Sequence, residues 1–468
     1  MRIHGRMPAE NLLPEPAWIH DAVFMHVYPL GACGAPATND FHSVPAARLD
    51  RLLPWLDEWA ALGVNAVFLG PVFESSTHGY DTADYFQVDR RLGDDAALGR
   101  LVEGLHARGM KVVVDAVFHH VGRAFWAFRD VREKGQASPY RSWFAGLRFD
   151  ARNRFGDPFV YQGWHGVEEL VKLDLRQDAV RQHLFDAVAH WVKRFDIDGL
   201  RLDAADAMDL EFFDGLHAFC ASLEKKLWLM GEVIHGDYRQ WARPGRLHAT
   251  TDYALWKALW SSHNDRNYFE LAHTLKRQYA AGEGMYEGLT LYTFADNHDV
   301  NRAASQLKEL RHLPLLYLLL FTLPGAPSLY YGSEWGQQGR KEGGDDRPLR
   351  SPLPEPPGPP DSPPGLRSAI SRYTALRHQH EALRRGHYRE LLVRNEQLAY
   401  ARELGRETLV VAVNSSDKPS DLVDLPMPGA AEGEWVDLLE PTRRLALRGG
   451  RLSLGVLPPA TGRVLRRV

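Results

Sequence analysis

The chain has 468 residues, of which 44% are hydrophobic and 25% are charged, a composition typical of a globular protein with two or three domains. Its formal net charge of −4 at pH 7 argues against nucleic acid and against an anionic membrane surface as the main partner. No apolar run reaches the length of a membrane span.

The N-terminus and the cysteines predict a cytoplasmic location. Met1–Pro16 lacks the apolar core and the small-residue cleavage site of a signal peptide. Cys33 and Cys220 are far apart in the sequence and have no metal-binding spacing, so we expect them to stay reduced. The sequence does not indicate an oligomeric state.

Near-continuous apolar runs of strand length alternate with helical patterns from Asp21 onward. Such runs are typical of parallel strands that are buried on both faces. We predict strands at 22–28, 66–69, 112–117, 200–202, 227–230, 250–254, 291–295 and 328–331. We predict helices at 47–62, 95–108, 178–194, 211–225, 267–281, 301–321 and 366–378. This alternation predicts an α/β fold, a (β/α)₈ TIM barrel; a doubly wound sheet is the alternative, but no glycine-rich phosphate loop follows the first strand.

Two segments depart from the barrel pattern. The connection 120–175 after the third strand is too long for a simple loop and is rich in aromatic residues, which predicts an inserted domain. The barrel then comprises 1–119 and 176–381, and the proline-rich stretch 351–365 is either a surface spacer or a stiff rim beside the site. Residues 382–468 form a C-terminal all-β sandwich domain, with strands predicted at 390–394, 398–402, 408–414, 434–437 and 451–457.

Acids and histidines follow five of the predicted strands. In a TIM barrel, functional side chains gather at the carboxyl ends of the strands. Taken singly, each of these residues is more often structural, but a cluster of carboxylates is costly and therefore implies a use. The residues are His78, Tyr80 and Asp81 after the second strand, Asp115, His119 and His120 at the third, Arg201 and Asp203 at the fourth, Glu232 after the fifth, and Asp296–Asp299 after the seventh.

Asp203 and Glu232 are expected to play different parts. Arg201 and Asp203 are two apart on a strand and share a face, so the guanidinium should lower the pKa of Asp203 and keep it ionised as a nucleophile. Desolvation and nearby aspartates should raise the pKa of Glu232 and keep a proton on it. Neighbouring strands would put the two carboxyl groups roughly 5–5.5 Å apart, the spacing of a retaining glycosidase.

Apart from His78, Tyr80 and Asp81, these residues fall into four motifs: Asp115–His120, Gly199–Asp203, Gly231–His235 and Phe294–Asp299. With them, the chain resembles the α-amylase superfamily, glycoside hydrolase family 13, across nearly its whole length. Through 170–174 it loosely resembles the maltodextrin-degrading neopullulanases and cyclomaltodextrinases, which usually carry an extra N-terminal β domain.

The resemblance implies a retaining hydrolase that cleaves α-1,4-glucosidic bonds of maltooligosaccharides, maltodextrins or cyclodextrins through a covalent glycosyl-enzyme. It implies that Asp203 is the nucleophile, Glu232 the general acid/base and Asp299 the stabiliser of the transition state. The substrate-binding residues that it implies are His78, Tyr80, His120, Arg201, His235, His298, Asp346 and Arg350.

Three departures from the family pattern shape the expectations. His119 replaces an asparagine that commonly helps to hold calcium, so we expect no required cofactor and no metal at that site. Asp206-Ala207 and Ile234 differ from common residues on the leaving-group side, which keeps an α-glucan transglycosylase as the alternative. The expected partner is an α-glucan oligosaccharide; an inactive carbohydrate-binding protein is disfavoured because none of the three acids is missing.

Overall fold

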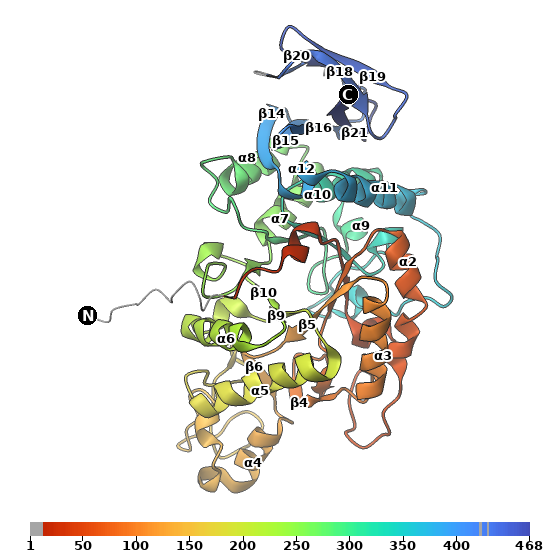
Figure 1. Ribbon diagram of the computed structural model, residues 1–468. Helices are drawn as coiled ribbons and strands as arrows, with labels where there is room; N and C mark the ends of the chain where they lie inside the picture. The colour runs from red at the N-terminus through yellow and green to blue at the C-terminus, as the bar shows by residue number, and fades with distance from the viewer. Residues whose placement is uncertain (1–12, 421–423, 428–429) are drawn as a thin grey trace, which may run out of the picture.

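The computed structural model describes residues 13–420, 424–427 and 430–468 (Figure 1), so the expectation for Met1–Pro16 lies mostly outside the described residues. Its centre is a parallel sheet of eight strands in the order β11-β10-β9-β5-β2-β1-β13-β12. A parallel bridge between Thr251 and Tyr292 joins the two ends of this order and closes the barrel. The predicted TIM barrel is confirmed, with strands β1 (Phe24–Val27), β2 (Ala66–Leu69), β5 (Lys111–Ala116), β9 (Gly199–Leu202), β10 (Trp228–Gly231), β11 (Ala249–Thr250), β12 (Tyr292–Phe294) and β13 (Ala326–Tyr330).

Successive residues of a barrel strand face alternately the barrel interior and the surrounding helices. Phe24 lies in the interior cluster, and its ring stacks on that of Trp228 with centroids 5.5 Å apart. The next residue, Met25, belongs to the larger outer core under the helices. Because both faces are buried, most of these strands read as nearly continuous apolar runs, which is why the sequence pattern found them.

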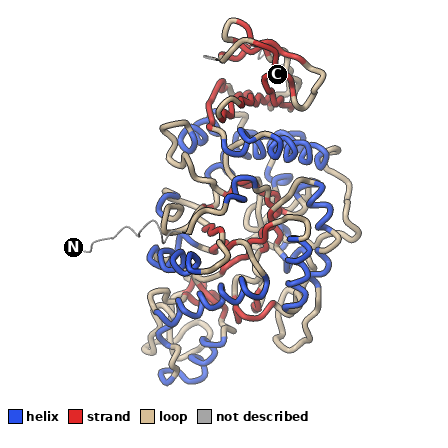
Figure 2. The backbone as a smooth tube through the Cα atoms, viewed as in Figure 1, coloured by secondary structure: helices blue, strands red, loops and turns tan. Residues whose placement is uncertain are grey.

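The helices form the outer ring of the barrel (Figure 2). Their bounds are α1 (Pro29–Ala32), α2 (Trp55–Ala61), α3 (Asp95–His106), α5 (Asp178–Phe195), α6 (Leu210–Ser222), α7 (Tyr253–Asn264), α8 (Tyr268–Tyr279), α9 (Ala303–Gln306), α10 (Leu313–Thr322), α11 (Leu366–Gln379) and α12 (Glu381–Arg385). Among the described helices, none is both long and apolar enough to cross a lipid bilayer.

Three predicted elements were wrong in detail. The helix predicted at 47–62 is a 3₁₀ turn, Arg48–Leu52, followed by α2, because Pro54 lacks the N–H that a continuous helix needs. The helix at 301–321 is likewise divided, into α9 and α10 with a turn between them. The strand predicted at 250–254 ends at Thr250, because Asp252 caps α7 by accepting a hydrogen bond from the Leu255 N–H.

The inserted segment carries helix α4 (Trp126–Lys134) and a small sheet in the order β6-β8-β7. Its strands are β6 (His120–Gly122), β7 (Gly163–Trp164) and β8 (Val167–Lys172). Strands β6 and β8 are antiparallel neighbours, with His120 opposite Lys172. Because β6 begins four residues after β5 ends, this sheet is held directly against the carboxyl end of the barrel. A neighbouring hairpin of β3 (Phe73–Ser75) and β4 (Thr82–Val88) presents the loop 76–81 to the same rim.

The C-terminal region is all-β, as predicted, and forms one antiparallel sheet of eight described strands. The first and last strands of that sheet, β14 and β17, contact each other, so the sheet curls around a core that includes Trp435 and Leu465. The strands are β14 (His387–Val393), β15 (Gln397–Leu404), β16 (Glu407–Asn414), β17 (Asp424–Pro426), β18 (Gly433–Asp437), β19 (Arg444–Arg448), β20 (Arg451–Ser453) and β21 (Thr461–Arg467). Sequence analysis missed β17, β19 and β21.

The C-terminal sheet packs on helix α10, which is buried all round. The hydroxyls of Thr322 and Tyr400 are 2.5 Å apart across this contact. The proline-rich stretch lies along the barrel, where Leu353 N–H donates to Ala32 and Ser362 N–H donates to Trp335.

Candidate active site

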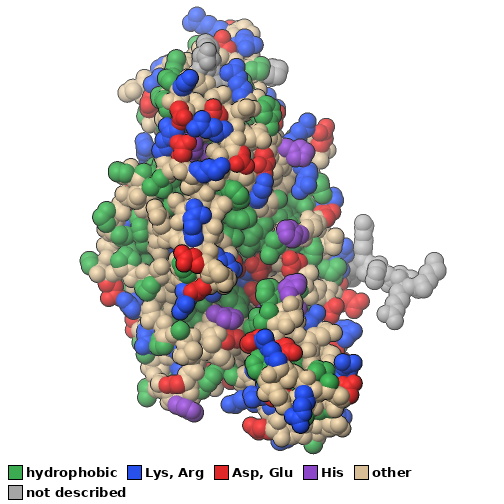
Figure 3. Space-filling model, turned by 180° about the vertical axis from the view of Figure 1, so that it is seen from behind, with side chains coloured by type: hydrophobic (Ala, Val, Ile, Leu, Met, Phe, Trp, Pro, Cys, Tyr) green, Lys and Arg blue, Asp and Glu red, His purple; other side chains and the backbone are tan. Residues whose placement is uncertain are grey.

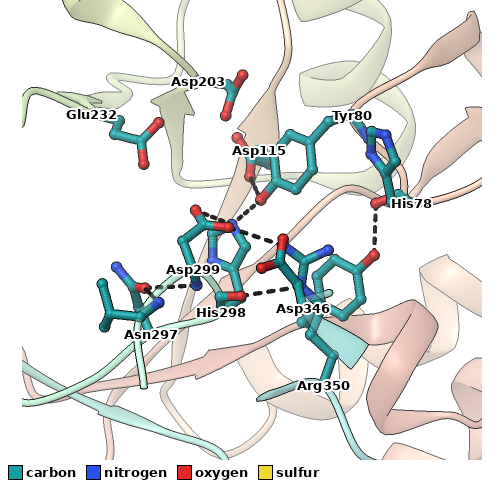
Figure 4. A network of polar contacts seen from close by, with 12 residues as sticks. His78, Tyr80, Asp115, Asp203, Glu232, Asn297, His298, Asp299, Asp346 and Arg350 are labelled. Carbon is teal, nitrogen blue, oxygen red and sulfur yellow. Dashed lines mark hydrogen bonds and ion pairs between the residues drawn. The ribbon is translucent and has the colours of Figure 1, made fainter. Parts of the chain in front are cut away.

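Three neighbouring strands place four charged side chains at the carboxyl end of the barrel, and Figure 4 shows three of them, Asp115, Asp203 and Glu232. Strand register aligns Asp115 of β5 with Arg201 of β9, and Arg201 with Met230 of β10. Asp203 and Glu232 each follow their strand directly, and the Glu232 N–H donates to the Leu202 carbonyl. The three carboxyl groups and Arg201 therefore share one mouth.

Arg201 joins these three carboxyl groups. Its Nη1 donates to Asp115 Oδ1 at 2.9 Å and to Asp203 Oδ1 at 2.8 Å. Its Nη2 lies 2.8 Å from Glu232 Oε1. The guanidinium is 3% exposed, so one desolvated cation balances a cluster that would otherwise be repulsive.

The expectation that Arg201 keeps the pKa of Asp203 low was wrong. Burial raises the pKa of Asp203 to about 7, and the nearby Asp115 and Asp299 add to this rise, which outweighs the attraction of Arg201. Burial raises the pKa of Glu232 to about 7 as well, and Asp203 contributes to that rise. The two carboxyls thus act as a coupled pair that holds a proton near neutral pH.

Asp299 lies opposite this pair in a network of its own. Arg350 Nη2 is 2.9 Å from Asp299 Oδ1 and 3.0 Å from Asp346 Oδ2, and His298 Nε2 is 3.0 Å from Asp299 Oδ2. Burial alone would raise the pKa of Asp299, but His298 and Arg350 hold that pKa below its ordinary value. Asp299 therefore stays ionised at a pH at which the pair of Asp203 and Glu232 still holds a proton.

Tyr80 connects the two groups. Its hydroxyl donates to Asp115 Oδ2 at 3.0 Å and also contacts His298 Nε2, and its ring stacks on the His298 ring with centroids 5.4 Å apart. His78 is partly exposed beside it and its carbonyl accepts a hydrogen bond from the Tyr28 hydroxyl. These residues form the wall of the site on the side of Asp346 and Arg350.

Comparison with known proteins gives the family. The model of the alpha amylase catalytic domain matches residues 52–385, and that of the neopullulanase-like C-terminal domain matches residues 388–465. The chain belongs to the α-amylase family. It is an α-amylase-type glycoside hydrolase.

Individual members of the family show how far the similarity extends. The chain is 30% identical to a cyclomaltodextrinase of Geobacillus thermopakistaniensis over 96% of this chain and 77% of that protein. It is 30% identical to an intracellular maltogenic amylase of Bacillus subtilis over 66% of this chain and 51% of that protein. The structure of a cyclic α-maltosyl-(1→6)-maltose hydrolase from Arthrobacter globiformis aligns with a TM-score of 0.80 and 25% identity, covering 97% of this chain and 99% of that one.

The structure brings together most of the residues that the sequence pointed to. His120 Nε2 lies 3.9 Å from Asp203 Oδ2, and His298, Tyr80 and Arg350 contact one another or Asp299 as described. His235 does not join this cluster, because it is exposed on the loop after β10. Its assignment as a substrate-binding residue remains a prediction.

Sequence reasoning missed Tyr253 as a partner of Glu232 and Asn297 as a partner of Tyr253. The Tyr253 hydroxyl donates to Glu232 Oε1 at 3.3 Å and accepts a hydrogen bond from Asn297 Nδ2 at 3.1 Å. Asn297 Oδ1 in turn accepts from the N–H groups of Asp299 and Val300. This chain of contacts links the loop that carries Asp299 to Glu232.

His119 is the residue from which we predicted that no metal is held at the third strand. His119 is buried, its Nδ1 lies 3.1 Å from His120 Nδ1, and its carbonyl accepts a hydrogen bond from the Leu173 N–H. Across the described part of the chain, no group of three or more His, Cys, Asp or Glu side chains is arranged to hold a metal ion. The absence of a required metal remains a prediction.

Proposed function

We propose that this enzyme hydrolyses α-1,4-glucosidic bonds of maltooligosaccharides, maltodextrins and cyclodextrins with retention of configuration. The observation that carries the proposal is that Arg201 contacts both Asp203 and Glu232, while His298 and Arg350 hold Asp299 opposite this pair. The cyclomaltodextrinase and maltogenic amylase names of the relatives support the substrate class.

In the first step, the ionised Asp203 attacks the anomeric carbon, and Glu232 gives its proton to the oxygen of the departing sugar. The bond from that oxygen to the anomeric carbon breaks as the bond to Asp203 forms. Arg201 balances the charge that moves between the two carboxyls, since it contacts both. In the second step, Glu232 takes a proton from water, which displaces Asp203.

Asp299 would hold hydroxyls of the sugar whose bond is cleaved. A carboxylate kept ionised by His298 and Arg350 accepts hydrogen bonds from hydroxyls and stabilises positive charge that develops on the sugar ring. His78, Tyr80, His120, Asp346 and Arg350 line the same side and would bind the donor part of the glucan.

The test is the conversion of maltoheptaose and β-cyclodextrin by the wild type and by Glu232→Gln. We expect turnover by the wild type, with α-configured products at early times by polarimetry or NMR, and a loss of about 10³-fold or more in the variant. Full activity of Glu232→Gln, or β-configured products, would contradict the proposal.

A transglycosylase that uses the same intermediate is the second candidate. Asp206 is engaged by the backbone, because its Oδ2 accepts a hydrogen bond from the Ile234 N–H at 3.2 Å, and Ala207 carries only a methyl group. The leaving-group side therefore differs from that of many α-amylases, and products longer than the substrate would favour this candidate.

We place the activity in the cytoplasm, a location supported by the free Cys33 and Cys220 and by the name of the intracellular relative.

A further inference from the structure

Arg91 is a buried guanidinium at the base of the β3–β4 hairpin, which presents the loop 76–81 to the rim of the barrel. It comes shortly after Val88, the last residue of β4. Its side chain is 4% exposed and lies 2.6 Å from the carboxylate of Asp89, which is 1% exposed. A buried ion pair is costly unless its remaining hydrogen-bonding groups are satisfied, so the other N–H groups of Arg91 need partners inside the protein.

Each of the five N–H groups of this arginine has an oxygen partner. Nε donates to Asp89 Oδ1 at 2.9 Å. Nη2 donates to Asp89 Oδ2 at 2.6 Å and to Ser75 Oγ at 2.7 Å. Nη1 donates to the Thr77 carbonyl at 2.5 Å and to the Pro36 carbonyl at 3.2 Å. The planar guanidinium is therefore matched by oxygens along its whole edge.

These oxygens belong to two separate loops. Pro36 lies in the loop that follows α1, whereas Ser75 ends β3 at the neck of the loop 76–81. Asn39 strengthens the same contact, because its Nδ2 donates to the Ser75 carbonyl at 2.9 Å. Arg91 and Asn39 thus hold the loops that follow β1 and β2 against each other.

Beyond its neck, the loop 76–81 is closed on itself. The Thr77 hydroxyl donates to Asp81 Oδ2 at 2.7 Å, and the Thr77 N–H donates to Asp81 Oδ1 at 3.1 Å. The tip carries His78 and Tyr80, which Figure 4 shows side by side, and the Tyr80 N–H donates to His78 Nδ1 at 3.2 Å. Because Thr77 is the chain neighbour of His78, a shift of the Thr77 carbonyl would displace His78 as well.

The closed loop borders a hollow of about 720 Å³. The wall of this hollow on the barrel side consists of Ser76, Thr77, His78 and Asp81. Its other wall belongs to the inserted domain, and Figure 3 shows histidine and acidic side chains along the boundary between the barrel and that domain, which is the lobe at the lower right. The position of the loop neck therefore sets the shape of the wall that carries His78.

We propose that Arg91 is a positioning residue for substrate binding, whose guanidinium fixes the loop 76–81 and with it His78, without touching the substrate. The inference rests on the proposed function, in which His78 and Tyr80 bind the donor sugar. The arginine cation is permanent and its planar group is rigid, so charge-assisted hydrogen bonds hold the neck of the loop. A lysine would keep the charge, but its three donors around one nitrogen cannot reach all of these oxygens.

Loss of the Arg91 side chain should weaken binding more than it slows the chemical step. Tyr80 keeps contacts of its own through its hydroxyl, and Arg201 still contacts both reacting carboxyls. The Thr77 carbonyl would lose its charged donor, so the adjacent His78 is the binding residue that shifts.

The experiment measures kcat and KM for maltoheptaose in Arg91→Ala and Arg91→Lys. We expect Arg91→Ala to raise KM about 10-fold or more and to change kcat by less than about threefold. Arg91→Lys should raise KM by about 3- to 10-fold, since it keeps the charge but not the geometry. Guanidinium chloride at about 20 mM should lower the KM of Arg91→Ala at least about threefold by entering the vacated site, whereas the same concentration of sodium chloride should not.

Arg463→Ala is the matched control. Arg463 is also 4% exposed, lies 3.4 Å from the Asp437 carboxylate and donates to the carbonyls of Leu454 and Val456, but it belongs to the C-terminal sheet. Its loss should lower the Tm and leave the KM for maltoheptaose unchanged, with or without guanidinium chloride.

An unchanged KM in Arg91→Ala, a loss confined to kcat, or an equal response of both alanine variants to guanidinium chloride would overturn the positioning role. If Arg91→Ala does not fold, Arg91→Lys decides by the same change in KM, and an unchanged KM there would overturn the proposal. A wild type that does not cleave maltoheptaose would instead overturn the proposed function on which the inference rests.

Discussion

Arg201 lies between Asp203 and Glu232, 2.8 Å from an oxygen of each. A single buried cation therefore contacts both carboxyls of the proposed reaction, together with Asp115. A proton that moves from Glu232 leaves a charge that the same guanidinium already contacts, so little reorganisation is required. The division of roles arises within a coupled pair, since burial raises both pKa values to about 7.

The first prediction concerns Asp203. In Asp203→Asn, the amide oxygen can still accept a hydrogen bond from Arg201, but the proposed nucleophile is lost. The kcat should therefore fall by about 10³-fold or more on every α-glucan. The KM for maltoheptaose should change far less, because Asp299, Arg350 and Tyr80, which we propose to bind the donor sugar, are unchanged. Polarimetry and product chromatography provide the measurement, and thermal unfolding checks that the variant is folded.

The second prediction is the pH dependence of activity. The active form of the pair carries one proton, so activity should fall on the acid side when a second proton binds and on the alkaline side when the last proton leaves. Because burial raises both pKa values to about 7, we expect the alkaline fall near neutral pH rather than in the range of ordinary carboxyls. The measurement is kcat/KM for maltotetraose between pH 4 and 9; a flat profile would refute the shared proton.

The third prediction concerns Tyr253. Its hydroxyl accepts from Asn297, so its own proton points to Glu232 and stabilises the ionised form of that carboxyl. Tyr253→Phe should therefore raise the pKa of Glu232, shift the alkaline limb of the pH profile upward and lower kcat by about 10-fold.

Tyr292→Phe is the control for this variant. Tyr292 is also a buried barrel tyrosine, but its hydroxyl donates to Ser328 rather than to a reacting group. It should leave the pH profile in place. An unshifted alkaline limb in Tyr253→Phe would show that Tyr253 does not act on Glu232.

The contrast between Asp203 and Tyr253 shows what the sequence could predict. The strand that precedes Asp203 is buried on both faces, and Asp203 lies only two residues from Arg201. The sequence alone therefore revealed both the barrel strand and the charged cluster. The contact of Tyr253 with Glu232 depends on where helix α7 begins and on Asn297, which is distant in the sequence. The raised pKa of Asp203 was hidden for a similar reason, because it depends on burial and on Asp115 from another strand.

The fourth prediction concerns metal removal. The ammonium of Lys172 near His119 places positive charge at the junction of the inserted domain and β5, where a cation would be repelled. Dialysis against EDTA should therefore leave both the Tm and the activity on maltoheptaose unchanged. A drop in Tm that added calcium reverses would contradict this expectation.

The fifth prediction concerns stability and Glu334. This carboxyl is 1% exposed, both of its oxygens lack a good hydrogen-bond partner among the described residues, and burial raises its pKa to about 7. Because the folded state binds this proton more tightly than the unfolded state, Glu334 lowers the free energy of unfolding as pH rises from about 4 through about 7. A shift of this size corresponds to about 3 kcal/mol at alkaline pH.

Glu334→Gln removes that charge and keeps the shape of the side chain. The variant should be more stable than the wild type at pH 8, by up to about 3 kcal/mol, and nearly equal to it at pH 5, where the wild-type carboxyl is already protonated. Urea unfolding at the two pH values measures the difference. The control is Glu133→Gln on α4, where the side chain is exposed, and it should show no such pH-dependent gain in stability. An equal gain for Glu334→Gln at both pH values would show that buried charge is not the cause of that gain.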